Sequence, residues 1–236
     1  METVGVNVTH DASFCRCVNG EIDMFLEEER LSRKKHDNMP VKTVMELQEN
    51  NFAGVTGLEY HDYSLRDTCN FFDVIFRKKI PDHDYRTYNQ HHYLHACCGF
   101  YNSGFEEADV VVVDGLGNFF DEEHHECATR WHIKKPAEIK LLERQGASRF
   151  GTKTDRHGYW PMGVGMAYAS ISDYLGFGQL GSGKVMGLAP YGKEDPNIKP
   201  FVIDGRVNSK LFYRTKYSAN FIPYDYLPEE VNIKDQ

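Results

Sequence analysis

The stretch DVVVVDGLG, residues 109–117, carries the strongest strand signal in the chain. Four consecutive valines favour a strand, and a continuous β-branched run is typical of a strand covered on both faces of its sheet. The run ends at Asp114 and a glycine-rich turn, so a carboxylate is expected at the carboxyl end of a buried strand. Ligand-contacting groups lie at this position in open α/β sheets. The stretch therefore predicts an α/β fold with a polar site at the turn.

The N-terminal region shows the same order of elements. Three strands and a helix are predicted there, at residues 4–9, 14–18, 21–26 and 41–51. Two further strands and a helix are predicted after residue 114, at residues 128–133, 139–143 and 163–175. The repetition predicts two related α/β lobes, residues 1–108 and 109–236, with a cleft between their polar turns.

Composition limits the class of protein. The 236 residues are 41% hydrophobic and 26% charged, which is enough to build a substantial core. No apolar run approaches the roughly 20 residues that span a bilayer, and the N-terminus lacks the features of a signal peptide, so we expect a cytoplasmic protein with no membrane partner. The net charge of −8 argues against a nucleic-acid partner. Six cysteines without a C-x-x-C pattern are expected to be reduced thiols.

Two histidines between the predicted lobes suit a metal ion. If residues 89–101 form a helix, His91 and His95 lie one turn apart on one face, and His92 points elsewhere. His92 occupies the place of the glutamate in H-E-x-x-H, which excludes the metalloprotease pattern. Asp114 could add a carboxylate oxygen, giving a mixed set that suits iron(II), manganese or zinc. The alternative is that these histidines cap or pack a buried helix.

A glycine-rich segment, GSGKVMGLAPYG at residues 181–192, is typical of a backbone that approaches an anion. Glycine removes the Cβ atoms that block close contact, and successive amides together with the ammonium of Lys184 can face a phosphate. The spacing is not that of the phosphate loop of nucleotide hydrolases. The alternative is a turn that joins two elements.

Two charged segments admit plain explanations. Acidic and basic residues alternate over residues 27–37, which is typical of a solvated face. Residues 121–127 are rich in histidine and carboxylates, but we expect a solvated hairpin tip there because two strands should be joined at this point.

Five motifs in this order resemble the O-carbamoyltransferases, a family that includes the nodulation, cephamycin and tobramycin carbamoyltransferases. The resemblance runs from about residue 4 to about residue 195. The motifs are GVNVTHDAS at 5–13, EEERLSRKKHD at 27–37, HHxxHA at 91–96, DGxG at 114–117 and GKxMGLAPYG at 183–192.

The resemblance implies a fold of the actin, Hsp70 and sugar-kinase type, that is, an RNase H-like fold with duplicated lobes. In that family a separate C-terminal YrdC-like domain makes carbamoyl-adenylate from carbamoyl phosphate and ATP. The N-terminal domain then transfers the carbamoyl group to a hydroxyl of a small-molecule acceptor.

The resemblance also implies roles for single residues. His91, His95 and Asp114 match the ligands of the family's iron, which holds the adenylate phosphate. His10 matches the proposed general base, and Asp11 would orient it or a water, although a plain turn residue is an equal explanation for Asp11. The substrate and nucleotide cleft would be lined by Gly115, Gly117, Gly183, Lys184 and Gly187, with Arg33, Lys35 and His36 at its acceptor or carbamoyl end.

The chain departs from the family in length. We expect the second lobe to be incomplete and the YrdC-like domain to be absent, as in a fragment or a truncated reading frame. Activity would then depend on the missing parts. The alternatives are a nucleotide-binding phosphotransferase or ATPase of the actin-like superfamily, and a non-catalytic remnant. The phosphotransferase would not need the histidine pair.

Overall fold

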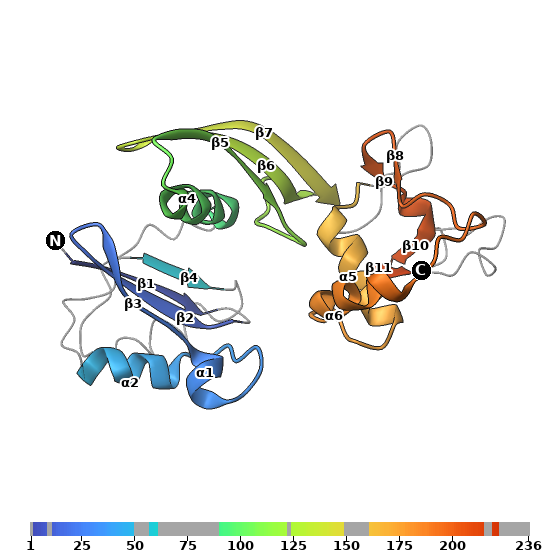
Figure 1. The fold of residues 1–236 in the computed structure, drawn as a ribbon. Coiled ribbons are helices and arrows are strands. Elements are labelled where there is room, and N and C mark those ends of the chain that lie inside the picture. The colour runs from blue at the N-terminus through green and yellow to red at the C-terminus, as the bar shows by residue number, and fades with distance from the viewer. Residues whose placement is uncertain are drawn as a thin grey trace. The chain divides into compact units, whose positions relative to one another are not determined.

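The computed structural model describes residues 2–8, 11–49, 57–60, 90–121, 124–148, 161–214 and 219–221 (Figure 1). The chain divides into two compact units, Met1–Tyr88 and Asn89–Gln236. Both units combine helices with small sheets, so the chain is a mixed α/β protein. The lobe boundary between residues 108 and 109 stays a prediction. Among the described helices, none is both long and apolar enough to cross a membrane.

The first unit is built on a four-stranded sheet in the order β3-β2-β1-β4. Its strands are β1 (Glu2–Val8), β2 (Ser13–Val18), β3 (Glu21–Glu27) and β4 (Gly57–Tyr60). The first three strands pair antiparallel, and β4 pairs parallel with β1. This confirms the predicted three-stranded meander. The turn between β2 and β3 has positive φ at both Asn19 and Gly20, as tight hairpins require.

Two helices follow the meander, α1 (Glu28–Ser32) and α2 (Val41–Glu49). The helix predicted for residues 41–51 is thereby confirmed over residues 41–49, and residues 50 and 51 lie outside the described residues. The apolar core of the unit comes from the sheet, the turn between β1 and β2, and α2: Val4, Val6, Ala12, Phe14 and Val44 are all buried.

A buried carboxylate fixes the start of α2. Glu28 lies in α1 with 1% of its surface exposed. It accepts hydrogen bonds from the amides of Lys42 and Thr43, at 3.1 and 2.8 Å, and from the Thr43 hydroxyl at 3.0 Å. These amides belong to the first turn of α2, where backbone N–H groups have no carbonyl acceptor within the helix. Residues 27–37 are therefore not simply a solvated face, because one of their carboxylates is a buried helix cap.

We expect Glu28→Ala to lower the free energy of unfolding of the chain by about 2–3 kcal/mol, because it leaves buried amides without acceptors. Glu28→Gln should cost less, since it keeps one acceptor oxygen. Urea denaturation followed by circular dichroism measures both effects. Glu21→Ala, at the exposed start of β3, is the matched control, and a loss as small as that of the control would contradict the capping role.

The second unit contains a three-stranded antiparallel sheet in the order β5-β6-β7. Its strands are β5 (Glu107–Val113), β6 (His124–Lys134) and β7 (Glu138–Ser148). Helix α4 (His91–Ser103) lies along one face of this sheet (Figure 1). Helix and sheet share one core cluster: Ala96, Phe100, Val112, Trp131 and Ile133.

The rest of the second unit contains the helix α5 (Val164–Tyr174), which confirms the helix predicted for residues 163–175. The smaller elements are α6 (Ser182–Leu188), η2 (Ala189–Tyr191), β8 (Val202–Ile203), β9 (Arg206–Val207), η3 (Ser209–Leu211), β10 (Phe212–Arg214) and β11 (Ala219–Phe221). A second core cluster contains Met162, Ala167, Val207, Leu211 and Phe212.

Two expectations about the sheet of the second unit are wrong. The valine run is not covered on both faces, because Val111 and Val113 are 65% and 58% exposed. Their face of the sheet carries a charged network in which Arg130 and His132 both contact Asp109. The hairpin tip expected at residues 121–127 is wrong for residues 124–127, because β6 begins at His124 and buries Glu126 and Cys127; residues 122 and 123 lie outside the described residues.

The glycine-rich segment is also not a loop. Residues 182–188 form the short helix α6, and a 3₁₀ turn follows at residues 189–191. The amides of Lys184 and Val185 both bond the carbonyl of Gly181, at 2.8 and 3.4 Å. Two of its seven residues, Gly183 and Gly187, are glycines, so the sequence did not predict a helix here, because glycine is a poor helix former.

Candidate metal centre

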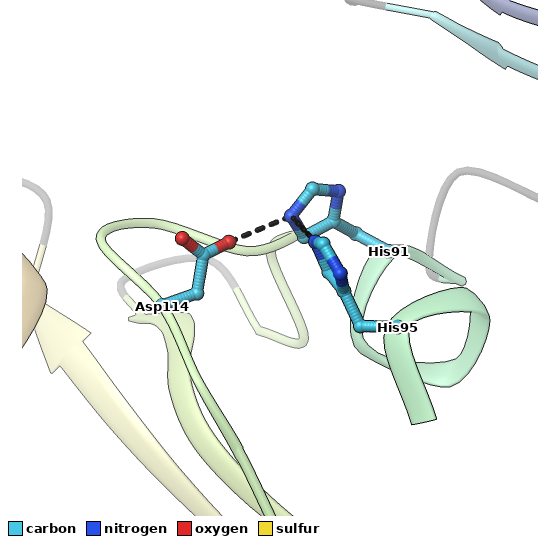
Figure 2. A group of neighbouring side chains, drawn as sticks. All are labelled: His91, His95 and Asp114. Atoms are coloured by element: carbon cyan, nitrogen blue, oxygen red, sulfur yellow. Dashed lines mark hydrogen bonds and ion pairs between the residues drawn. The ribbon is translucent and has the colours of Figure 1, made fainter. Parts of the chain in front are cut away.

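The structure brings together the three residues that the sequence predicts as metal ligands. His91 and His95 lie on the first turns of α4, and Asp114 follows β5 directly. Figure 2 shows both imidazoles and the carboxylate converging on one point, and their ligand atoms all lie within 4.8 Å of one another. His91 Nε2 lies 2.7 Å from Asp114 Oδ2 and 3.2 Å from His95 Nε2.

These distances fit a single ion. Two ligand atoms bound at about 2.1 Å, with an angle of about 90–110° between them, are roughly 3.0–3.4 Å apart. The two imidazole nitrogens are already at such a separation. The shorter contact between His91 and Asp114 is a hydrogen bond whose proton an ion would replace. Two imidazole nitrogens and one carboxylate oxygen suit a divalent transition metal, and three protein ligands leave positions open. That this set binds a metal stays a prediction.

Asp114 is held in the ionised form that a cation needs. The hydrogen bond from His91, helped by the Gly115 amide at 2.6 Å, lowers the pKa of Asp114 to about 2. Partial burial opposes this shift but does not cancel it. Asp114 therefore carries its negative charge throughout the neutral range.

A side-chain hydrogen bond links the two halves of the site. Asn118 Oδ1 accepts the backbone amide of His91 at 2.8 Å, and so caps the start of α4 from the turn that carries Asp114. The turn itself is fixed to β6 by three backbone bonds: Asp114 N to Cys127 O at 3.0 Å, Gly117 N to Glu126 O at 2.7 Å and Glu126 N to Asn118 O at 2.9 Å. Sequence reasoning missed Asn118, because it lies 27 residues from the amide that it caps.

His92 points away from the centre and into the core, as the helical spacing predicts. It is fully buried, and its Nδ1 lies 2.9 Å from the Thr129 hydroxyl, which also accepts from the Trp131 indole at 2.8 Å. Burial lowers the pKa of His92 to about 4, so the ring is neutral at physiological pH. A Cβ on Gly117 would lie 2.7 Å from His92 Nε2, so glycine is required there by internal packing.

The remaining predicted residues of the first unit do not all fall within the described parts. His10 lies outside the described residues. Asp11 contacts His36, with 2.8 Å between Oδ1 and Nδ1. Arg33 and Lys35 are exposed.

In the second unit, Gly115 lies beside Asp114, whereas the amide of Gly117 is already bonded to Glu126. Gly183, Lys184 and Gly187 are exposed on α6. The Lys184 ammonium lies 5.7 Å from the centre of the Phe177 ring. Their roles in nucleotide binding stay predictions.

We expect His91→Ala and His95→Ala each to abolish most binding of a divalent transition ion, because each removes one of three ligands. Anaerobic purification followed by elemental analysis measures the metal content. His132→Ala is the matched control, since His132 lies on the opposite, charged face of the sheet; His92→Ala is unsuitable because it would open a cavity in the core. Equal metal content in the parent and both ligand variants would rule out the site.

We also expect the chain to lose stability in acid through His92. Its folded pKa of about 4 lies below the ordinary value of 6.5, so its contribution is complete above pH 6.5 and is lost as the pH falls through 4. The loss should reach up to about 3 kcal/mol. His92→Gln, which does not titrate, should flatten the unfolding free energy over this pH window. A His92→Gln curve parallel to the parent would contradict the assignment.

Comparison with known proteins adds to this geometry. Residues 41–224 match a family model described as carbamoyltransferase N-terminus, and this span contains His91, His95 and Asp114. The chain is similar to nodulation protein NolNO of Sinorhizobium fredii, with 24% identity over 216 residues that cover 80% of this chain and 28% of that protein. It is also similar to uncharacterized protein sll1178 of Synechocystis, with 25% identity covering 85% of this chain and 36% of that protein.

A third similar protein covers less of the chain. Nodulation protein NolO of Bradyrhizobium diazoefficiens is 33% identical over 107 residues, which are 44% of this chain and 16% of that protein. The chain thus spans about a third or less of the length of the curated relatives that it matches.

Proposed function

The chain belongs to the carbamoyltransferase N-terminal family, and we propose that it carries the transfer site of an O-carbamoyltransferase. In this proposal the carbamoyl group passes from carbamoyl-adenylate to a hydroxyl of a small-molecule acceptor. A YrdC-like domain outside this chain makes the adenylate from carbamoyl phosphate and ATP. The observation that carries the proposal is the family match over residues 41–224, which includes the assembled triad of His91, His95 and Asp114.

The triad would hold the adenylate phosphate through a divalent ion, with iron(II), manganese and zinc all compatible with its donors. A bound ion supplies positive charge to the phosphate oxygens and so stabilises the leaving group. Helix α5 would add further positive electrostatic potential at this position. A Cβ on Gly165, in the first turn of α5, would lie 2.6 Å from the Gly115 nitrogen, so the amino end of α5 packs directly against the Asp114–Gly115 backbone. The positive end of a helix dipole beside the triad favours an anionic ligand.

Helix α6 supplies further support for nucleotide binding. Gly183 and Gly187 are exposed, and a Cβ built on either would meet no atom within 4 Å. Alanine would fit both positions and stabilise the helix by up to about 1 kcal/mol each. Packing in the described structure therefore does not explain these glycines, whereas close approach of a ligand to the helix backbone does. Lys184, between them, would contribute a positive charge.

The chemistry also needs a group that accepts the hydroxyl proton. The family resemblance places this role on His10, with Asp11 beside it, and an imidazole suits the task because its ordinary pKa lies near neutrality. The acceptor would enter near Arg33, Lys35 and His36. We also propose that the protein acts in the cytoplasm, because carbamoyl phosphate and ATP are cytoplasmic metabolites.

The proposed fold is the duplicated actin-like, RNase H-like architecture. Its support is the parallel order of elements in the two units. An antiparallel meander followed by a helix occurs as β1-β2-β3 and α2 in the first unit, and as β5-β6-β7 and α5 in the second.

The test uses the full-length protein that contains this chain, supplied with labelled carbamoyl phosphate, ATP, iron(II) and a panel of polyhydroxylated acceptors. We expect label to enter the acceptor with formation of AMP, and His95→Ala to reduce transfer at least 100-fold while His132→Ala leaves it unchanged. Formation of ADP in place of AMP would instead indicate a phosphotransferase or ATPase. Absence of both products with every acceptor would favour a non-catalytic remnant.

A further inference from the structure

Two cysteine sulfurs lie side by side on the outer face of the sheet of the first unit. Cys15 and Cys17 both belong to β2, and their Sγ atoms are 3.9 Å apart. Side chains alternate along a strand, so the buried Phe14 faces the apolar core and both cysteines face the opposite side. Both cysteines are half-buried, and neither forms a disulfide.

The surroundings of the two sulfurs are small or apolar. The four residues that pair with the cysteines in the strand register are Thr3 and Gly5 on β1, and Ile22 and Phe25 on β3. A Cβ built on Gly5 would meet no atom within 4 Å, so the described structure leaves open space beside Cys15. Ile22 and Phe25 are 53% and 56% exposed. This face therefore offers two thiols and an open approach, with no carboxylate or imidazole at the paired positions.

The separation of the sulfurs suits a shared metal ion. Two thiolate sulfurs bound at about 2.3 Å, with an angle of about 110–120° between the bonds, are roughly 3.8–4.0 Å apart. The Sγ atoms of Cys15 and Cys17 are already at this separation. A thiolate keeps further lone pairs when it binds an ion, so hydrogen bonds that the sulfur accepts do not prevent coordination.

A disulfide suits the same pair less well. A strand rises about 3.2–3.4 Å per residue, so the Cα atoms of residues two apart are about 6.4–6.8 Å apart. Disulfides usually join Cα atoms about 4.4–6.8 Å apart, most often about 5.5–6 Å. The irregularity of the sheet at this point skips Asp23 of β3, whereas β2 keeps consecutive partners on β1. Because β2 is regular here, its geometry favours a bridging ion over a sulfur–sulfur bond.

The donors also indicate which ion fits. Soft thiolates select soft ions such as Cu(I) and zinc. A structural zinc site takes four protein ligands, and the paired positions beside Cys15 and Cys17 add only the hydroxyl of Thr3. Cu(I) is the softer of the two ions and accepts a low coordination number. On binding, each thiol releases its proton to solvent and forms a sulfur–copper bond, with no change of oxidation state.

The other described cysteines are placed differently. Cys97 and Cys98 are consecutive on α4, so their side chains point about 100° apart around the helix. Burial raises the pKa of the Cys97 thiol. Burial also raises the pKa of Cys127, whose Sγ donates to the Gln145 carbonyl at 3.4 Å. A thiol that burial keeps protonated is a poor metal ligand.

We propose that Cys15 and Cys17 form a dithiolate site for Cu(I) on the outer face of the β3-β2-β1-β4 sheet. The donors differ from those of the candidate metal centre, which offers two imidazoles and a carboxylate to a divalent ion. The inference goes beyond the proposed carbamoyl transfer and does not depend on it.

The test titrates the reduced full-length protein with Cu(I) under anaerobic conditions, in competition with a chromogenic Cu(I) chelator. We expect Cys15→Ser and Cys17→Ser each to bind one Cu(I) fewer than the parent. Affinity at this site should fall at least about 100-fold, because loss of a residue that only supports a ligand already costs about 10–100-fold. Cys98→Ser, which removes an exposed thiol, is the matched control and should match the parent. The same differences should persist in a His91→Ala background.

X-ray absorption at one equivalent of copper should show sulfur as the nearest neighbour of the ion. Cooperative melts check that the serine variants fold, and Cys15→Ala and Cys17→Ala repeat the test without a hydroxyl. Equal Cu(I) uptake by the parent and the variants at positions 15 and 17 would overturn the site, and so would its loss in Cys98→Ser. A Cys15–Cys17 disulfide formed by peroxide, without any difference in Cu(I) uptake, would identify a redox pair and also overturn it.

Discussion

The hydrogen bond from the His91 amide to Asn118 is the constraint on which the candidate metal centre depends. It joins the first turn of α4 to the turn after β5, and three backbone bonds hold that turn against β6. Because these bonds engage the backbone or a short side chain, the turn is positioned before any ion arrives. Among the ligands themselves, His91 contacts both Asp114 and His95. The scaffold therefore determines the geometry, and the ligand side chains determine the chemistry.

Much of this centre could be read from the sequence, because its signals are local. The spacing of His91 and His95 places both rings on one face of any helix, and a polar residue after a valine run marks the end of a strand. The same kind of local pattern located the meander and helix of the first unit and both long helices of the second. Asn118, which completes the centre, caps a residue 27 positions earlier in the chain, and a periodic sequence pattern does not predict such a contact.

The wrong expectations have a common physical origin in tertiary packing. Valine at 111 and 113 satisfies strand propensity even on an exposed face, so composition could not show that α4 covers only one side of the sheet. The two glycines of α6 hide a short helix, because glycine is a poor helix former. Likewise, alternating charges over residues 27–37 conceal a buried cap at Glu28 and an imidazole held by Asp11, because charge patterning says nothing about which side chains turn inward.

The contact between α5 and the Asp114 turn has a consequence for how relatives diverge. A Cβ on Gly163 would lie 2.6 Å from Cys127 Cβ, and one on Gly165 would lie 2.6 Å from the Gly115 nitrogen, so backbone meets its neighbours with no side chain between them. Neither position can gain even a methyl group unless α5 retreats. A homologue with a larger residue at either position must therefore have a displaced α5, and the positive end of the helix dipole would then lie farther from a bound anion. These two glycines thus offer a test, readable from an alignment, of which relatives retain the same phosphate geometry.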